Sequence, residues 1–216
     1  MKNKEFAVFG LGKFGRSVAE TLAESGCEVL AVDKDEETVQ DIADKVTYAA
    51  KADATDKDAL QTLGVSNLDA AVVAIAENME VSILVTIYLK ELGVPYVIVK
   101  AQSEIHASIL KKVGADDIIF PEREMGARIA RNLISGNFID YVELSSKISM
   151  AEIEVPVEWV GKSLRDLNIR DKYSINVVGI KDGDDIEVNI NPGRLLKSGE
   201  IMILIGDNSS LQKLTR

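Results

Sequence analysis

Three closely spaced glycines near the start of the chain have the spacing of a phosphate-binding loop. Gly10, Gly12 and Gly15 follow the apolar run Phe6 to Phe9 and open a stretch with helical periodicity. The first glycine permits a tight turn, the second lets a pyrophosphate approach the backbone, and the third lets helix and strand pack closely. Asp33 ends the next β-branched run, where its carboxylate can accept hydrogen bonds from both hydroxyls of a ribose. We expect a dinucleotide-type site here; the alternative is a purely structural turn.

The loop leaves the identity of the nucleotide open. Asp33 would repel a ribose 2′-phosphate, which argues against NADP, whereas ATP, ADP and NAD or NADH present the same adenosine diol. Lys13 could add positive charge beside the phosphates, and it equally fits a solvated lysine near a helix start. Phe14 completes the loop and Lys34 follows Asp33, so both are counted with the candidate nucleotide-binding residues.

Further candidates follow the later strands, because ligands of parallel sheets bind in the crevice outside the carboxyl ends of the strands. Asp53, Thr55 and Asn78 among them equally suit helix capping. The candidates are Asp53 and Ala54 after the third strand, Ala76, Glu77 and Asn78 after the fourth, and Lys100, Ala101 and Gln102 after the fifth.

The sequence contains few side chains that could act as catalytic groups. A dehydrogenase needs a group that exchanges a proton with the substrate, and the only histidine, His106, stands at a helix start, where a ligand contact suits it better than general acid catalysis. One histidine and one cysteine also exclude a zinc site of the usual ligand spacing. A nucleotide site without catalytic groups favours a sensor, with a small NAD-dependent oxidoreductase as the alternative.

The elements that must position these residues alternate between strands and helices as far as about residue 120. Such alternation predicts an α/β fold, a doubly wound parallel Rossmann sheet with helices on both faces. We expect strands over residues 6–9, 28–32, 47–50, 70–75, 96–99 and 117–120, and helices over 12–25, 35–45, 57–63, 78–92 and 104–113.

Pro121 opens a further helix over residues 122–134. The sheet does not need it as a crossover, so its apolar Met125, Ile129 and Leu133 must be buried in a dimer contact or on the chain's own sheet. Glu122, in its first turn, suits the helix dipole; the other interpretation is a cation ligand that bridges a metal ion to nucleotide phosphates.

After residue 140 short strands dominate, and we expect a second, smaller α+β domain over residues 141–216, following a first domain over 1–140. Strands are predicted at 151–155, 175–180, 186–190 and 201–205, with one helix over 163–167. Residues 181–185 and 191–193 are predicted to form hairpin turns. A domain of this size is near the lower limit for a stable core, so self-association would support it.

Composition limits the class of protein. The 216 residues include 46% hydrophobic and 28% charged ones, which is typical of folded proteins. A formal charge of −10 argues against nucleic-acid binding, which needs a clustered basic face. The single cysteine, Cys27, fits a cytosolic protein. We find no signal-peptide pattern and no apolar run of about 18 to 20 residues, so any membrane role should act through a partner.

Taken together, several motifs resemble the Ktr/Trk cytosolic regulatory subunits of potassium uptake systems. The resemblance covers essentially the whole chain and implies a nucleotide-binding RCK (or KTN, TrkA-N) domain followed by a smaller C-terminal RCK (TrkA-C) domain. The motifs are the glycine loop with Arg16, Ala31 to Asp33, Asp53 to Asp56, Val99 to Ala101, Gly114 to Asp116, Pro121 to Gly126 and Val160 to Leu164.

This resemblance implies a gating subunit and no enzyme. It implies a homodimer joined through the helix over residues 122–134, and an octameric ring of such dimers. The ring would dock on a membrane-embedded potassium channel-like subunit, which would place the protein in the cytoplasm at the inner face of the cell membrane. In this family ATP favours the conducting ring and ADP the inactive one.

Site residues are carried over by position. Lys13 would contact a phosphate, in a place where an arginine often stands, and Asp33 would hold the ribose. Glu122 would bind a cation beside the phosphates. The residues that would flank the adenosine or line the crevice are Asp53, Ala54, Ile75, Ala76, Glu77, Lys100, Ala101, Gln102 and His106.

Some relatives also bind cyclic di-AMP between two C-terminal domains. Apolar residues at the matching positions would wall the bases, while Arg170 and Asn176 would contact phosphates and polar edges. Relatives can carry aspartate at Asn168 and histidine at Ile175, and all these residues equally suit the core and turns of a small domain. The matching positions are Leu164, Asn168, Ile169, Arg170, Ile175, Asn176 and Pro192.

Overall fold

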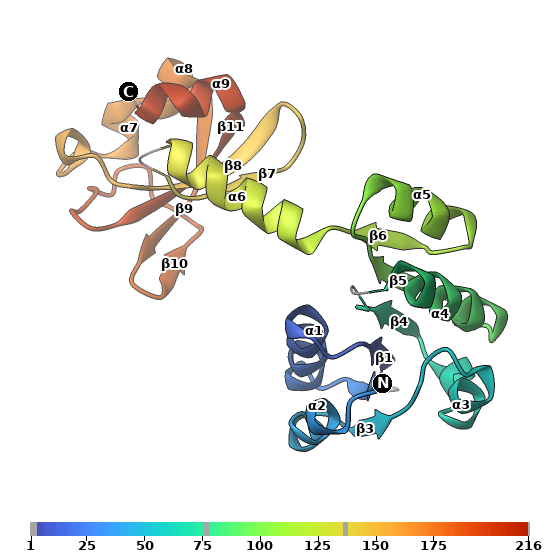
Figure 1. Ribbon diagram of the computed structural model, residues 1–216. Coiled ribbons are helices and arrows are strands. Elements are labelled where there is room, and N and C mark those ends of the chain that lie inside the picture. The colour runs from blue at the N-terminus through green and yellow to red at the C-terminus, as the bar shows by residue number, and fades with distance from the viewer. Residues whose placement is uncertain (1–3, 76–77, 136–137, 216) are drawn as a thin grey trace. The chain divides into compact units, whose positions relative to one another are not determined.

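The computed structural model describes residues 4–75, 78–135 and 138–215. Its internal contacts divide the chain into two compact units, Met1–Pro121 and Glu122–Arg216 (Figure 1). The boundary predicted at residue 140 would place the helix over 122–134 with the first unit, whereas the contacts group it with the second. Among the described residues, no helix combines the length and the apolar character that a membrane crossing requires.

The first unit is built on six parallel strands in the order β3-β2-β1-β4-β5-β6. This order is that of a doubly wound Rossmann sheet, so the predicted fold class is confirmed. The strand order reverses between β1 and β4, which is where such sheets bind ligands. The strands are β1 (Glu5–Phe9), β2 (Glu28–Asp33), β3 (Tyr48–Lys51), β4 (Ala70–Val73), β5 (Val97–Lys100) and β6 (Asp117–Ile119).

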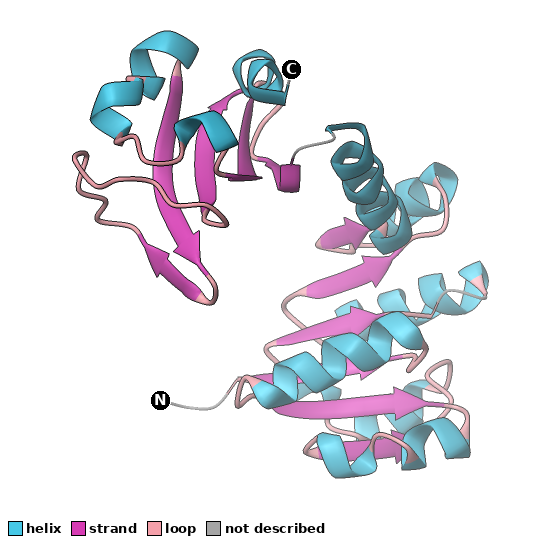
Figure 2. Ribbon diagram, turned by 90° about the vertical axis from the view of Figure 1, so that its left-hand side faces the viewer, coloured by secondary structure: helices cyan, strands magenta, loops and turns pink. Residues whose placement is uncertain are grey.

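Helices cover both faces of this sheet (Figure 2). Because side chains alternate along β1, Val8 packs with Ala19 and Ile42 on one face, while Phe9 packs with Leu89 and Leu110 on the other. The crossover elements are α1 (Lys13–Glu24), α2 (Glu36–Gln40), the 3-10 turn η1 (Ala43–Lys45), α3 (Lys57–Thr62), the 3-10 turn η2 (Val65–Asn67), α4 (Met79–Glu91) and α5 (Glu104–Lys112).

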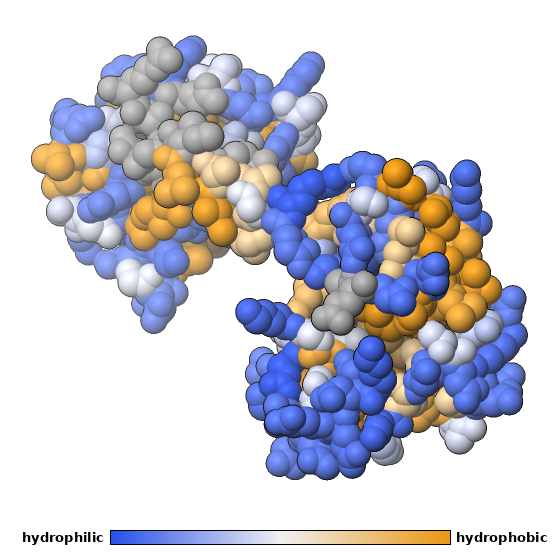
Figure 3. Space-filling view, in the orientation of Figure 1, coloured by the Kyte–Doolittle hydropathy of each residue, from blue (hydrophilic) through white to orange (hydrophobic). Residues whose placement is uncertain are grey.

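Two predicted elements of the first unit end early. The helix predicted over 35–45 stops at Gln40, and a tighter turn in which Ile42 N donates to Val39 O buries the Ile42 side chain. The strand predicted over 70–75 ends at Val73, and Ile75 lies beside Gly10. Figure 3 shows an apolar surface over α4 and α5, where Ile105 and Met79 are exposed.

The second unit is an α+β domain, as predicted, with an antiparallel sheet in the order β10-β9-β11-β8-β7. Its core includes Trp159, Ile175, Met202 and Leu204. The strands are β7 (Phe138–Glu143), β8 (Ile148–Glu154), β9 (Ile175–Asp182), β10 (Asp185–Glu187) and β11 (Ile201–Asp207). The helical elements are α6 (Pro121–Ser135), η3 (Val157–Trp159), α7 (Leu164–Leu167), α8 (Ile169–Tyr173), α9 (Asn208–Leu211) and η4 (Gln212–Thr215).

Sequence patterns were least informative in this second unit. The turn at Gly183 joins β9 to β10 as predicted, but β10 ends at Glu187 and residues 191–193 are not a hairpin turn. The chain after β10 instead returns to α7, where Leu195 forms an antiparallel bridge with Ser163. The prediction also missed the edge strand β7 and the short helices α8 and α9.

A partly buried ion pair fixes the long segment between β10 and β11. Glu200 is 1% exposed and accepts hydrogen bonds from the Arg194 guanidinium and from the Lys197 backbone. Glu187 contacts Arg194 Nε at 2.9 Å from a more exposed position. The hydrogen bonds from Arg194, followed by that from Lys197, hold the pKa of Glu200 below its ordinary value against the effect of burial.

Replacing Glu200 tests this ion pair. A carboxyl group with a lowered folded pKa stabilises the fold above the unfolded value of about 4.3, and this stability is lost as the pH falls through the folded pKa. We expect Glu200→Gln to lower the unfolding free energy by about 1–3 kcal/mol at pH 7, and by less at pH 3. The single tryptophan, Trp159, reports unfolding of the second unit by fluorescence. Glu187→Gln is the control, with an expected loss under about 1 kcal/mol; equal losses for Glu200→Gln at both pH values would contradict the assignment.

Candidate nucleotide site on the first unit

The glycine loop joins the carboxyl end of β1 to the start of α1. Gly10 adopts a φ of +90°, which L side chains rarely take, and its amide donates to Val32 O at 2.9 Å. Gly12 is the N-cap of α1 and has no side chain with which to cap it. The first turn of α1 carries no carboxylate, so its amide donors and the positive end of the helix dipole suit an anion.

Gly12 and Gly15 are glycines for different reasons. A Cβ atom on Gly15 would stand 1.9 Å from Gly10 O, so helix α1 can approach β1 this closely only without a side chain there. A Cβ atom on Gly12 would meet nothing within 4 Å, so the fold does not require glycine at this position. The glycine pattern of the sequence predicts that a phosphate binds in this open space beside Gly12.

Asp33, the last residue of β2, holds the loop in place. Its Oδ2 accepts a hydrogen bond from Leu11 N at 2.7 Å, and its Oδ1 accepts one from Asp35 N at 3.0 Å. Each carboxylate oxygen has a second lone pair, so the same group can still accept from ribose hydroxyls. The sequence pattern predicted the ribose contact and missed the support of the loop, which depends on the pairing of β1 with β2.

Lys100 on β5 brings positive charge near the start of α1. Lys100, the last residue of β5, is 9% exposed, and its Nζ lies 5.8 Å from the centre of the Phe14 ring in the first turn of α1. The structure thus brings Lys100 and Phe14 together, and a cation-π contact orients the ammonium group. Lys13 and Lys34 are exposed at the surface.

Residues that follow the other strands take mostly structural roles. Asp53 accepts hydrogen bonds from the Thr55 hydroxyl and amide, which lower the pKa of the Asp53 carboxyl. Helix α3 is capped by Asp56, not by Asp53 or Thr55, while Asn78 caps α4 as the sequence suggested. Ala54 and Ala101 are buried, and Ile75 contacts Gly10. The predicted candidates Ala76 and Glu77 lie outside the described residues.

The only histidine of the sequence, His106, forms a hydrogen bond with the backbone of Gln102, close to the carboxyl end of β5. His106 is fully buried, its Nδ1 accepts from Gln102 N at 3.3 Å, and Nε2 therefore carries the proton of the neutral ring. Burial lowers its pKa, so the ring is uncharged at pH 7. His106 positions Gln102 in this arrangement, and because its side chain is fully buried, its predicted contact with a ligand stays a prediction.

Glu122 lies in the first turn of α6 together with Glu124, a favourable place for a carboxylate at a helix dipole. Among the described residues, no group of three or more histidine, cysteine, aspartate or glutamate side chains is arranged to hold a metal ion. A cation at Glu122 stays a prediction.

On the second unit, the candidate cyclic di-AMP residues separate into two sets. Arg170 and Asn176 line a hollow of about 430 Å³ together with Asp171 and Ser174. Ile169 and Ile175 are buried in the core, and Leu164 packs against it. Asn168 is exposed in a left-handed conformation, and Pro192 O accepts from Arg165 N at 3.0 Å.

Comparison with known proteins agrees with both units. Residues 6–121 match the TrkA-N domain family and residues 150–216 match the TrkA-C domain family. The chain is 44% identical to Ktr system potassium uptake protein C of Bacillus subtilis (strain 168), over 99% of this chain and 96% of the relative. Ktr system potassium uptake protein A of the same organism is 39% identical over the same shares of the two chains.

The chain belongs to the Ktr/Trk family of potassium uptake proteins. Among solved structures, the GsuK RCK domain has a TM-score of 0.64 at 17% identity, covering 99% of this chain and 47% of that one, which shows the same fold. The resemblance read from the motifs is thereby confirmed, including the split into a TrkA-N and a TrkA-C domain. The two Bacillus subtilis relatives are named as potassium uptake proteins.

Two alanine substitutions separate the two roles of glycine in this Ktr/Trk loop. Gly15→Ala should lower the unfolding free energy of the first unit by about 1–3 kcal/mol, since α1 must move away from Gly10. Gly12→Ala should change it by less than about 0.5 kcal/mol, because its Cβ meets open space. Thermal unfolding followed by far-ultraviolet circular dichroism measures both. Equal stability of the two variants would contradict the close approach of α1 to β1.

Proposed function

We propose that this protein is a nucleotide-sensing regulatory subunit that binds ATP or ADP at the glycine loop and controls a membrane-embedded potassium transport subunit. NAD and NADH are the alternative ligand pair. The arrangement that carries this proposal is the uncapped start of α1 at Gly12, with Asp33 at one side and the Lys100 ammonium near Phe14 at the other. It offers amide donors and a cation for phosphates, and a carboxylate for a ribose.

Several observations favour regulation over catalysis. An oxidoreductase would need an acid or base beside its cofactor, and the one histidine is buried, neutral and engaged with Gln102. The relatives with 44% and 39% identity bear the names of potassium uptake proteins. A small NAD-dependent oxidoreductase is the alternative that turnover measurements would reveal.

Regulation by a nucleotide requires that binding change the conformation or the assembly of the protein. We infer that ATP and ADP stabilise different arrangements of paired subunits, and that a membrane partner responds to the shift in population. Self-association is supported by the apolar stripe of α6, where Met125, Ile129 and Leu133 are 52%, 52% and 78% exposed. The apolar surface over α4 and α5 offers a second contact, and two kinds of contact are what a ring of dimers needs. The octameric ring is part of this proposal.

A second ligand is proposed for the second unit. The hollow lined by Arg170 and Asn176 places a cation and an amide at one surface, which suits the phosphates and base edges of cyclic di-AMP. We expect calorimetry of the full chain to show binding that Arg170→Ala weakens at least tenfold, whereas Arg165→Ala, at another exposed arginine, changes it less than twofold. No heat of binding to the unaltered chain would remove this ligand from the proposal.

Titration with ATP, ADP, NAD and NADH tests the nucleotide site directly. Asp33→Ala removes both the ribose acceptor and the support of Leu11 N, so we expect at least a tenfold loss of affinity for the adenine nucleotide that binds. Asp35→Ala is the matched control, since this carboxylate only caps α2, and its affinity should stay within twofold. Unchanged affinity of Asp33→Ala would contradict the site, and oxidation of NADH with a simple substrate would favour the oxidoreductase.

A further inference from the structure

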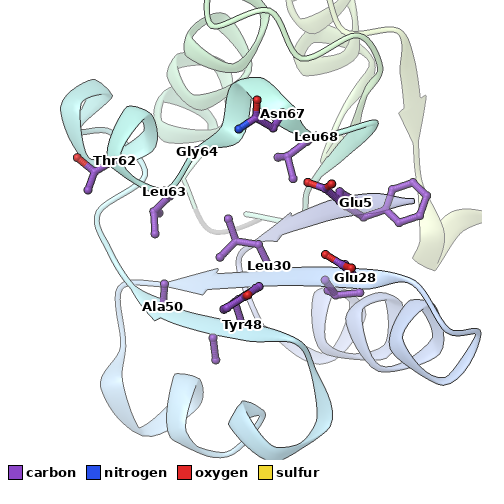
Figure 4. A pocket seen from close by; sticks show the side chains of 13 residues that line it. Glu5, Glu28, Leu30, Tyr48, Ala50, Thr62, Leu63, Gly64, Asn67 and Leu68 are labelled. Carbon is purple, nitrogen blue, oxygen red and sulfur yellow. The ribbon is translucent and has the colours of Figure 1, made fainter. Parts of the chain in front are cut away.

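A hollow of about 420 Å³ on the first unit has no part in the nucleotide site. It lies between the first halves of β1, β2 and β3 and the segment from Thr62 to Leu68 (Figure 4). Leu30, Leu63 and Leu68 contribute aliphatic side chains to it. Helix α3, which precedes this segment, has only six residues and is followed by the short 3-10 turn η2.

The hollow and the glycine loop occupy opposite ends of the same strands. Glu5, Glu28 and Tyr48 are the first residues of β1, β2 and β3, and all three line the hollow. The glycine loop follows the last residue of β1. At about 3.3 Å per residue, the five residues of β1 separate the two ends by about 16 Å. A partner in the hollow would therefore leave the nucleotide loop accessible.

The rim of the hollow is acidic. Strand pairing places Glu5 beside Glu28 in register, and Figure 4 shows their carboxylates on the same side of the hollow. Asp69 continues this row on the far side of β1, where its carboxylate accepts from Glu5 N at 2.8 Å. Among the described residues, none of those that line the hollow is a lysine or an arginine. The exposed Glu28 carboxylate supplies negative charge that would attract a cationic group.

The exposed Tyr48 side chain indicates that the hollow binds a protein. Its side chain is 66% exposed at the start of the edge strand β3, beside the aliphatic floor. A large aromatic side chain next to an apolar hollow with a polar rim is the usual composition of a binding hot spot. A metal ion fits less well, because the described part of the chain holds no cluster of three or more metal-ligating side chains.

We propose that this hollow docks a basic segment on the cytosolic side of the membrane transport subunit, with an apolar side chain in the hollow and a lysine or arginine beside Glu28. The inference rests on the proposed function. Cytosolic loops of membrane proteins carry an excess of lysine and arginine, so the acidic rim is complementary to them. The volume holds one or two side chains. The amino ends of the strands in each first unit would thus contact the membrane subunit, while the carboxyl ends of the same strands bind the nucleotide.

Charge reversal at the rim tests the docking site. The full chain is titrated against the potassium-transport membrane subunit of the same organism in nanodiscs, with ADP calorimetry and light scattering on each variant. Glu28→Lys should weaken nanodisc binding at least tenfold. Glu37→Lys makes the same change of net charge at an exposed position on α2 and should weaken it less than twofold. Tyr48→Ser should also weaken it, and ADP affinity and oligomeric state should stay unchanged in all three.

Each other outcome overturns the docking site in a different way. Equal effects of Glu28→Lys and Glu37→Lys would show a general charge effect. Loss of the assembled state in Glu28→Lys would show that the hollow joins copies of this chain. If the unaltered chain binds ADP but shows no affinity for empty or loaded nanodiscs, the proposed function fails together with this site. If the chain binds loaded nanodiscs and all variants bind equally well, the function stands and the site is wrong.

Discussion

The close approach of helix α1 to strand β1 is the constraint on which the candidate site depends. At Gly15 the helix backbone comes so near to Gly10 O that a single methyl group would stand 1.9 Å from it. This approach points the start of α1 across the carboxyl edge of the sheet, at the place where the strand order reverses. Asp33 then closes the loop through Leu11 N, and Lys100 reaches Phe14 from β5. The contact of Lys100 with Phe14 needs α1 in this position, because Phe14 lies in its first turn.

The two edges of the same sheet differ in chemistry. At the carboxyl edge, free amides and the Lys100 ammonium favour an anion. At the amino edge, Glu5, Glu28 and Asp69 form an acidic row beside an apolar hollow. A parallel sheet gives every strand the same direction, so residues at corresponding ends of neighbouring strands necessarily meet. The net charge of −10, which belongs to the whole chain, does not reveal this local difference between the two edges.

The sequence allowed us to predict features that depend on the local spacing of residues. It did not allow us to predict contacts between residues that are far apart in the chain. The glycine loop, Asp33 and the six parallel strands followed from spacing and β-branched runs. The bond from Leu11 N to Asp33 depends on the register of β1 with β2, and the contact of Lys100 with Phe14 joins residues far apart in the chain, so no local pattern signals them. In the second unit, residues 191–193 have hairpin composition, yet the bridge of Leu195 to Ser163 redirects the chain. Burial likewise separates Ile175, a core residue, from its exposed neighbour Asn176.

Hydrogen exchange of the full chain with and without saturating ADP, read residue by residue, tests most directly whether the glycine loop is the nucleotide site. The account predicts that ADP slows exchange of the amides from Leu11 to Arg16, which start α1, and of Lys34 and Asp35 beside the ribose acceptor. Amides from Gly64 to Leu68, at the opposite edge of the sheet, should exchange at an unchanged rate. Protection confined to the second unit, or an unchanged loop while ADP is bound, would contradict the account.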